Sequence, residues 1–85
     1  MQTLRMELEI TLDDVDERIM EIFSRYPSRW WKAHQIRSIL EYEGVFISGP
    51  DLWNRLKALS FLSLVIREKR SRVYRYRSLR RDKES

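Results

Sequence analysis

Basic residues crowd the last quarter of the chain, and their type and spacing favour one kind of chemistry. Residues 67–85 carry nine Lys and Arg against three acids, whereas residues 1–24 carry two Arg against seven acids. Lysine and arginine side chains bind phosphates and release the counterions that condense around a nucleic acid. The uneven charge, in a chain of formal net charge +4, therefore predicts an anion-binding element near the C-terminus.

The basic quarter divides into two parts with different expectations. Residues 80–85, RRDKES, contain no apolar side chain that could fix them, so we expect a disordered basic tail. Residues 67–77 mix cations with Val and Tyr and are expected to fold. Charge on an edge strand also protects it from aggregation, which is the alternative interpretation. Six basic residues opposed by Glu68 alone exceed what such protection needs.

Residues for catalysis or metal binding are sparse. The chain has one histidine, His34, and no cysteine, which excludes a disulfide framework and thiolate metal sites. His34 has no nucleophile or orienting carboxylate at a recognisable spacing, and no Gly-rich phosphate loop is present. We therefore expect no enzyme, no catalytic residue, no metal, no cofactor and no small-molecule ligand.

The elements that must position these cations follow from hydrophobic spacing. Ser48 precedes Gly-Pro-Asp, a strong helix-start pattern, and predicts a helix over 49–60. Leucines at 52, 56 and 59 form its buried face. After Leu62 the apolar period changes to two on both sides of Glu68-Lys69-Arg70-Ser71, which predicts a β-hairpin.

Two further helices are expected upstream. One has a capping box at Thr11 and Asp14, an apolar stripe from Val15 to Tyr26, and an end near Arg25 before Pro27. The other covers about 33–42 and is followed by Gly44, suited to a positive φ. Residues 1–12 alternate apolar and polar as a strand does, yet heptad spacing leaves a continuous helix open.

The stretch 32–77 resembles the winged helix-turn-helix family in its segments HQIRSIL, VFISGPDLWNRLKALSFLSLVI and VYRYR. The resemblance implies an α+β, mainly α fold of three helices and a C-terminal β-hairpin wing over residues 13–79, with residues 1–12 as an extension. It also implies binding of double-stranded DNA by a transcription regulator. The chain departs from the family pattern in a long turn before residue 48 and in the extra N-terminal residues.

In this family the third helix enters the major groove and the wing contacts phosphates. With the leucines inward, the outward or flanking residues become the expected base contacts: Pro50, Asn54, Arg55, Lys57 and Ala58. Asn54 is the best candidate for recognising a base, because an asparagine amide can form two hydrogen bonds with adenine. The expected phosphate contacts are Arg67, Lys69, Arg70, Arg72, Arg75, Arg29, Lys32 and Ser48. Ser48 and Asp51 are first of all capping residues.

The remaining expectations concern the rest of the molecule. Of Trp30 and Trp31, one is expected in the core and one partly exposed. The acidic first helix should lie away from DNA, where it and residues 1–12 could form a homodimer. A protein-binding winged helix using Trp53 and Phe61 is the alternative function. No membrane span is expected, and the protein should be cytoplasmic, with a composition compatible with a thermophilic source.

Overall fold

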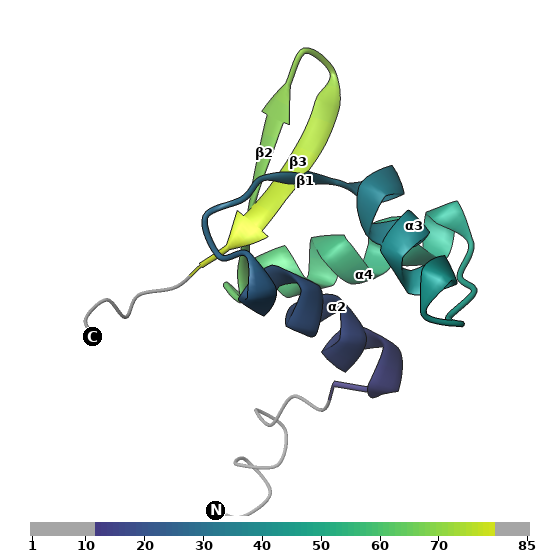
Figure 1. Cartoon of the computed structure of the whole chain (residues 1–85). Helices are drawn as coiled ribbons and strands as arrows, with labels where there is room; N and C mark the ends of the chain where they lie inside the picture. The colour runs from purple at the N-terminus through teal and green to yellow at the C-terminus, as the bar shows by residue number, and fades with distance from the viewer. Residues whose placement is uncertain (1–11, 80–85) are drawn as a thin grey trace, which may run out of the picture.

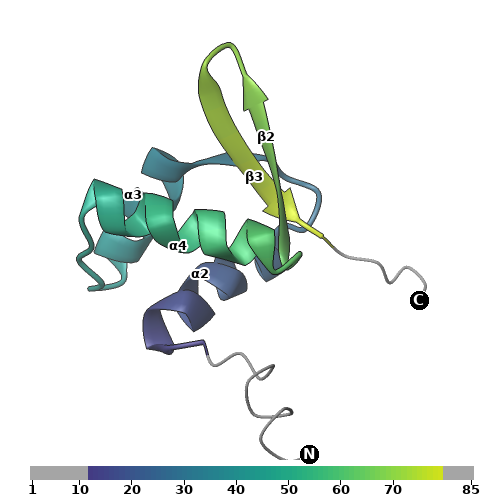
Figure 2. The ribbon, with the colours of Figure 1, turned by 180° about the vertical axis from the view of Figure 1, so that it is seen from behind.

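The computed structural model describes residues 12–79 and shows an α+β, mostly helical fold. Within these residues three helices pack beside a three-stranded antiparallel sheet whose strand order is β1-β3-β2. The elements, in chain order, are α2 (Asp14–Arg25), β1 (Trp31–Lys32), α3 (Ala33–Tyr42), α4 (Gly49–Phe61), β2 (Val65–Arg70) and β3 (Val73–Ser78). Figures 1 and 2 show the β2–β3 hairpin rising from one end of the molecule, α2 at the other end and α4 between them.

Four of these elements match the sequence-based expectation closely. The helix expected over 33–42 is α3, the helix expected over 49–60 extends by one residue as α4, and the hairpin forms as β2 and β3. Gly44 has φ +87°, the left-handed backbone expected after α3. The cause in each case is local, because caps and hydrophobic period lie within the segment itself.

The start of the first described helix differs from the expectation. Asp13, not Thr11, is the N-cap of α2, and Thr11 lies outside the described residues. The Asp13 Oδ1 accepts a 2.9 Å hydrogen bond from the backbone N–H of Asp16, and the Asp16 carboxylate accepts one from Asp13 N–H. A carboxylate satisfies the free N–H groups and also opposes the positive end of the helix dipole, which a hydroxyl does not do.

The core lies where the three helices meet one face of the sheet. Buried apolar side chains come from every element, and they are Ile19, Ile22, Phe23, Trp31, Ile36, Leu40, Ile47, Leu52, Leu56, Leu59, Val65 and Tyr76. Trp31 is buried and Trp30 half-buried, as expected. The expected burial of Tyr26 is wrong: its side chain is exposed, because it follows the helix as C-cap and no longer keeps the helical direction.

The short strand β1 was not expected and completes the sheet. Trp31 pairs with Tyr76 and Lys32 with Arg75, both on β3. The turn that joins β2 to β3 consists of Ser71 and Arg72, which both have positive φ, at 52° and 69°. The expected dimer contact through residues 1–12 and the first helix stays a prediction, and residues 1–11 lie outside the described part of the chain.

Candidate nucleic-acid interface

The polar side of α4 is exposed along its length. Leu52, Leu56 and Leu59 are buried, as the leucine spacing predicted. The opposite side presents the exposed residues Pro50, Asp51, Asn54, Lys57 and Ala58. Four of the five residues predicted to contact bases therefore share one accessible helix face, and Arg55 is the exception.

Lys57 also belongs to a second grouping, at the angle between α4 and the hairpin. We call this grouping the corner surface, and it consists of Trp53, Lys57, Arg67, Lys69 and Tyr74. The rings of Trp53 and Tyr74 meet edge to face with centroids 6.2 Å apart. Lys57 Nζ lies 4.7 Å from the Trp53 centroid, while Arg67 Cζ and Lys69 Nζ lie 4.5 and 5.6 Å from that of Tyr74. Two aromatic rings thus hold three cations on one surface.

The corner surface carries uncompensated positive charge. Among residues 12–79, no carboxylate forms an ion pair with Lys57, Arg67 or Lys69. The Arg67 Nη1 atom is buried without a hydrogen-bond partner in the described residues, and so is the neighbouring Tyr76 hydroxyl. Burial raises the pKa of that hydroxyl, and the Arg67 guanidinium partly opposes the rise. The cations of the corner surface therefore lack carboxylate partners in the described part of the chain, which leaves their charge available to an anionic ligand.

The strand register places Arg70 and Arg75, two other predicted phosphate contacts, on the opposite side of the sheet, together with Arg77, which was not predicted as a contact. Successive side chains of a strand point to opposite faces, so Arg70, Arg75 and Arg77 face away from Arg67 and Lys69. Lys32 of β1 pairs with Arg75 and shares this side. We call this set, with Trp30, the outer face.

Trp30 and two arginines form the centre of the outer face. The Trp30 ring lies beneath the guanidinium groups of Arg75 and Arg77, whose Cζ atoms are 4.5 and 4.9 Å from its centroid. Arg75 Nε also donates a 2.9 Å hydrogen bond to Glu68 Oε1 across the strands. Arg29, another predicted phosphate contact, instead covers the ring of Trp31 at 4.2 Å. The predicted phosphate contacts are thus divided between two faces.

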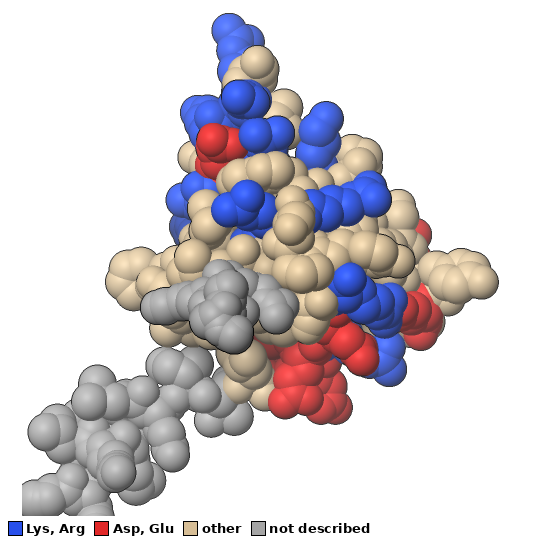
Figure 3. Space-filling view, turned by 60° about the vertical axis from the view of Figure 1, so that its left-hand side comes forward, with Lys and Arg blue, Asp and Glu red and all other residues tan. Residues whose placement is uncertain are grey.

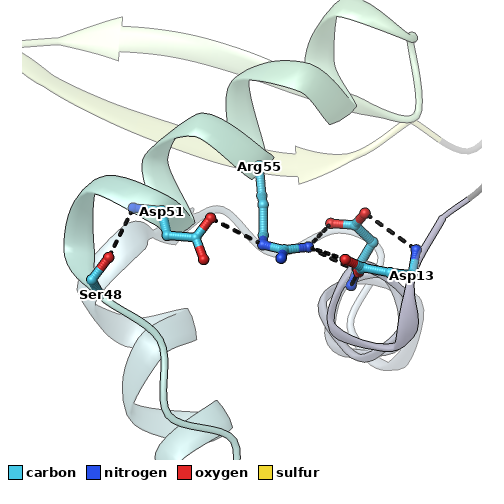
Figure 4. Close-up of polar contacts among 5 residues, drawn as sticks. Asp13, Ser48, Asp51 and Arg55 are labelled. Atoms are coloured by element: carbon cyan, nitrogen blue, oxygen red, sulfur yellow. Dashed lines mark hydrogen bonds and ion pairs between the residues drawn. The ribbon is translucent and has the colours of Figure 1, made fainter.

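Arg55 is bound to carboxylates of its own chain. Its Nη1 donates to both carboxylate oxygens of Asp13 at 2.8 Å and to Asp16 Oδ1 at 3.0 Å, and its Nε donates to Asp51 Oδ1 at 3.3 Å (Figure 4). The hydrogen bond from Arg55 is the main cause that lowers the pKa of Asp13, and the same pairing raises the pKa of Arg55. This geometry does not support the expected base contact by Arg55, because three carboxylates already hold its guanidinium.

Ser48 is the N-cap of α4. Its Oγ accepts a 3.1 Å hydrogen bond from the backbone N–H of Asp51, as the sequence predicted (Figure 4). Pro50 in the first turn needs no N–H partner, which suits it to that position. Ser48 therefore has a structural role as a helix cap, in addition to the phosphate contact expected of it.

Acidic residues gather at the end opposite the hairpin (Figure 3). Asp14, Glu17 and Glu21 line a shallow hollow on α2 together with Arg18. The helix is not entirely remote from α4, however, because Asp16 and Arg55 line a groove with Asn54 and Ala58. The Lys57 side of α4 thus adjoins the basic hairpin, and the Ala58 side adjoins acidic residues.

Sequence reasoning missed the contribution of Trp30, Trp53 and Tyr74 to holding the cations. The available signal for Tyr74 was the alternation on both strands: Arg67 and Lys69 share one face of β2, Tyr74 and Tyr76 share one face of β3, and pairing of the two strands brings them together. The pairing of Trp30 with Arg77 depends on β1, which is too short to show a period.

Comparisons of the chain with protein-family models, curated proteins and solved structures found no match. Within residues 12–79, no helix combines the length and apolar character needed to cross a membrane. The same residues hold no group of three or more His, Cys, Asp or Glu side chains arranged to bind a metal ion.

Proposed function

We propose that the protein binds double-stranded DNA through α4 and the β2–β3 hairpin. The observation that carries the proposal is the corner surface, where Lys57, Arg67 and Lys69 lie together without a described carboxylate partner. Cations held over aromatic rings lose little side-chain freedom when a phosphate binds them. Such an arrangement suits the regularly spaced charges of a duplex backbone.

The order of elements supports a winged helix-turn-helix interpretation. Three helices precede a basic hairpin, and the sheet order β1-β3-β2 is compatible with that architecture. In the proposed complex the exposed face of α4 enters the major groove, with Asn54 reading base edges and Lys57 contacting a guanine or a phosphate at the border with the corner surface. Arg67, Lys69 and Arg72 contact phosphates, and the acidic end of α2 faces away from the duplex. Regulation of transcription is the role that we propose for this activity.

The hairpin turn gives separate support. Ser71 and Arg72 adopt positive φ, a conformation that suits glycine or asparagine far better. Backbone strain is tolerated most often where a side chain has a function. An arginine at this position, at the tip of the hairpin, fits a phosphate contact.

A titration of mixed-sequence duplex DNA, measured by fluorescence anisotropy at several salt concentrations, tests the proposal. The variant Lys57→Gln with Lys69→Gln removes two exposed cations from the corner surface. The matched control, Arg18→Gln with Arg25→Gln, removes two exposed cations from α2, at the acidic end. Each variant's folded state is verified by circular dichroism and thermal unfolding.

Wild-type affinity should fall steeply as salt rises. The corner variant should bind more weakly and lose about 0.9 from the log–log salt slope for each phosphate contact removed. The control should keep the wild-type slope. Absence of duplex binding by the wild type at low salt, or equal losses in both variants, would refute the proposal.

Binding of another protein is the second candidate function. Phe61, at the end of α4, is 87% exposed, and Leu64, three residues later in the chain, is 36% exposed. Large exposed apolar side chains mark protein-binding surfaces when they lie together. Trp53, in contrast, is engaged with Lys57 and Tyr74. A protein-binding function would appear as duplex affinity too weak to measure at low salt.

A further inference from the structure

The outer face and the corner surface lie on opposite sides of the same sheet. Lys69 pairs with Tyr74 on the corner side, and the adjacent pair, Glu68 with Arg75, points to the other side. Because the strands alternate, the sheet backbone separates the two sets of cations. A duplex bound to the corner surface therefore lies on the far side of the sheet from the outer face.

Positive charge on the outer face exceeds its internal compensation. Glu68 is the carboxylate on this face, and it pairs with Arg75. Among the described residues, no ion pair involves Lys32, Arg70 or Arg77. Arg77 is also held over Trp30 at 4.9 Å, so its guanidinium is partly fixed before any ligand arrives.

The position of these cations decides which anion can reach them. Arg70 lies at the hairpin tip and could follow the tip into a groove of the first duplex. Lys32 and Arg77 lie at the base, where β1 pairs with β3 and the sheet joins the helices. The body of the protein keeps that base out of any groove. Lys32 and Arg77 are therefore placed to contact a different anionic partner.

We propose that the outer face binds the phosphate backbone of a second DNA segment, so that one protein molecule bridges two duplexes. This inference rests on the proposed function, because the first duplex occupies the corner surface. The two surfaces have similar chemistry, with three cations over aromatic rings on one side and a tryptophan beneath two arginines on the other. Neither surface needs base contacts to hold a phosphate backbone.

The experiment combines two measurements on the full chain. Anisotropy with one labelled duplex reports occupancy of the first surface. Capture of a second, fluorescent duplex by protein bound to an immobilised duplex reports bridging, and sedimentation gives the mass of the protein in both cases. The test variant is Lys32→Gln with Arg77→Gln. Lys32→Gln alone changes an exposed side chain, and Arg77→Lys retains the charge.

The wild type should capture the second duplex, whatever mass sedimentation gives for the protein. The double variant should bind a single duplex within about twofold of wild type yet capture about a tenth as much of the second, because phosphate contacts dominate non-specific affinity. Lys32→Gln alone should reduce capture of the second duplex. Arg77→Lys, which keeps the charge, should retain most of the wild-type capture. These variants keep the test valid if the double variant fails to fold.

Three results would overturn the inference. If wild-type protein binds one duplex but captures no second duplex, bridging is ruled out and the proposed function stays intact. Undiminished capture by the double variant would assign bridging to a protein dimer. An equal loss of single-duplex affinity and capture would mean that both faces serve one duplex. If the wild type binds no duplex at all, the proposed function itself fails.

Discussion

Arg55 Nη1 donates to both carboxylate oxygens of Asp13 at 2.8 Å, and this contact joins the middle of α4 to the N-cap of α2 (Figure 4). The two residues are separated by 42 positions in the chain. Asp16 and Asp51 also accept hydrogen bonds from the same guanidinium. Arg55 therefore fixes the orientation of the first turn of α2 against the helix proposed to enter DNA.

Replacing Arg55 with methionine should destabilise the fold while keeping the aliphatic part of the side chain. We expect the free energy of unfolding to fall by about 1 kcal/mol, since half-buried ion-pair networks exceed isolated surface pairs but remain screened by water. Arg25→Met, which removes a more exposed pairing with Glu21 and Glu43, should cost less. Urea titrations of both variants measure the difference, and equal costs would contradict a special role for Arg55.

Acid should weaken the link between Asp13 and Arg55. The hydrogen bond from Arg55 holds the pKa of Asp13 below its ordinary value. A carboxyl whose pKa is lower in the folded state stabilises that state above the unfolded pKa, and this contribution is lost as pH falls through the folded pKa. The free energy of unfolding should therefore decline as the pH falls below about 4.

Asp13→Asn provides the matching comparison, because asparagine remains a good N-cap but does not titrate. Its stability should depend less on pH in that acidic range than wild-type stability does. Glu41→Gln removes an exposed carboxylate that forms no ion pair within the described residues and should leave the acid dependence close to that of the wild type. Parallel acid curves for Asp13→Asn and wild type would show that the pair does not contribute.

Ser48 allows a capping role to be separated from a phosphate contact. Ser48→Ala removes the hydrogen bond from Asp51 N–H and should lower the free energy of unfolding by about 1 kcal/mol. Ser48→Asn should restore most of that stability. If capping is the whole role, duplex affinity measured well below the unfolding temperature should match wild type in both variants. Weakened binding by a fully folded Ser48→Ala protein would assign a direct contact to the hydroxyl.

Local sequence features were sufficient to predict α3, α4 and the hairpin. Ser48, the leucines of α4 and the change of period after Leu62 all act within a few residues, so their effect can be read without knowing the fold. The same leucines also predicted which side of α4 is exposed. The cap of α2 was misplaced by two residues because Thr11 and Asp13 both fit a capping pattern.

Features that depend on distant partners could not be predicted in this way. β1 contains two residues, Trp31 and Lys32, and becomes a strand through pairing with Tyr76 and Arg75. The ion pairs of Arg55 also join segments far apart in the chain, so its position on the helix flank gave no indication that carboxylates would surround it. The division of the cations between two faces required the register of the sheet.

The turn at Ser71 and Arg72 offers a test that separates stability from binding. Both residues have positive φ, so Arg72→Gly should relieve strain and raise the free energy of unfolding by about 1 kcal/mol. The same change removes the cation proposed to contact a phosphate, and duplex affinity should fall with a loss of about 0.9 in the salt slope. Unfolding curves and anisotropy titrations on one preparation measure both effects.

Two companion variants define what the turn contributes. Ser71→Asn should increase stability without changing the salt slope, because asparagine tolerates the left-handed conformation and the cation remains. Arg72→Lys should keep both the strain and most of the affinity. A more stable Arg72→Gly protein with an unchanged salt slope would place the hairpin tip away from phosphates. The strained arginine would then have no binding role to account for its position.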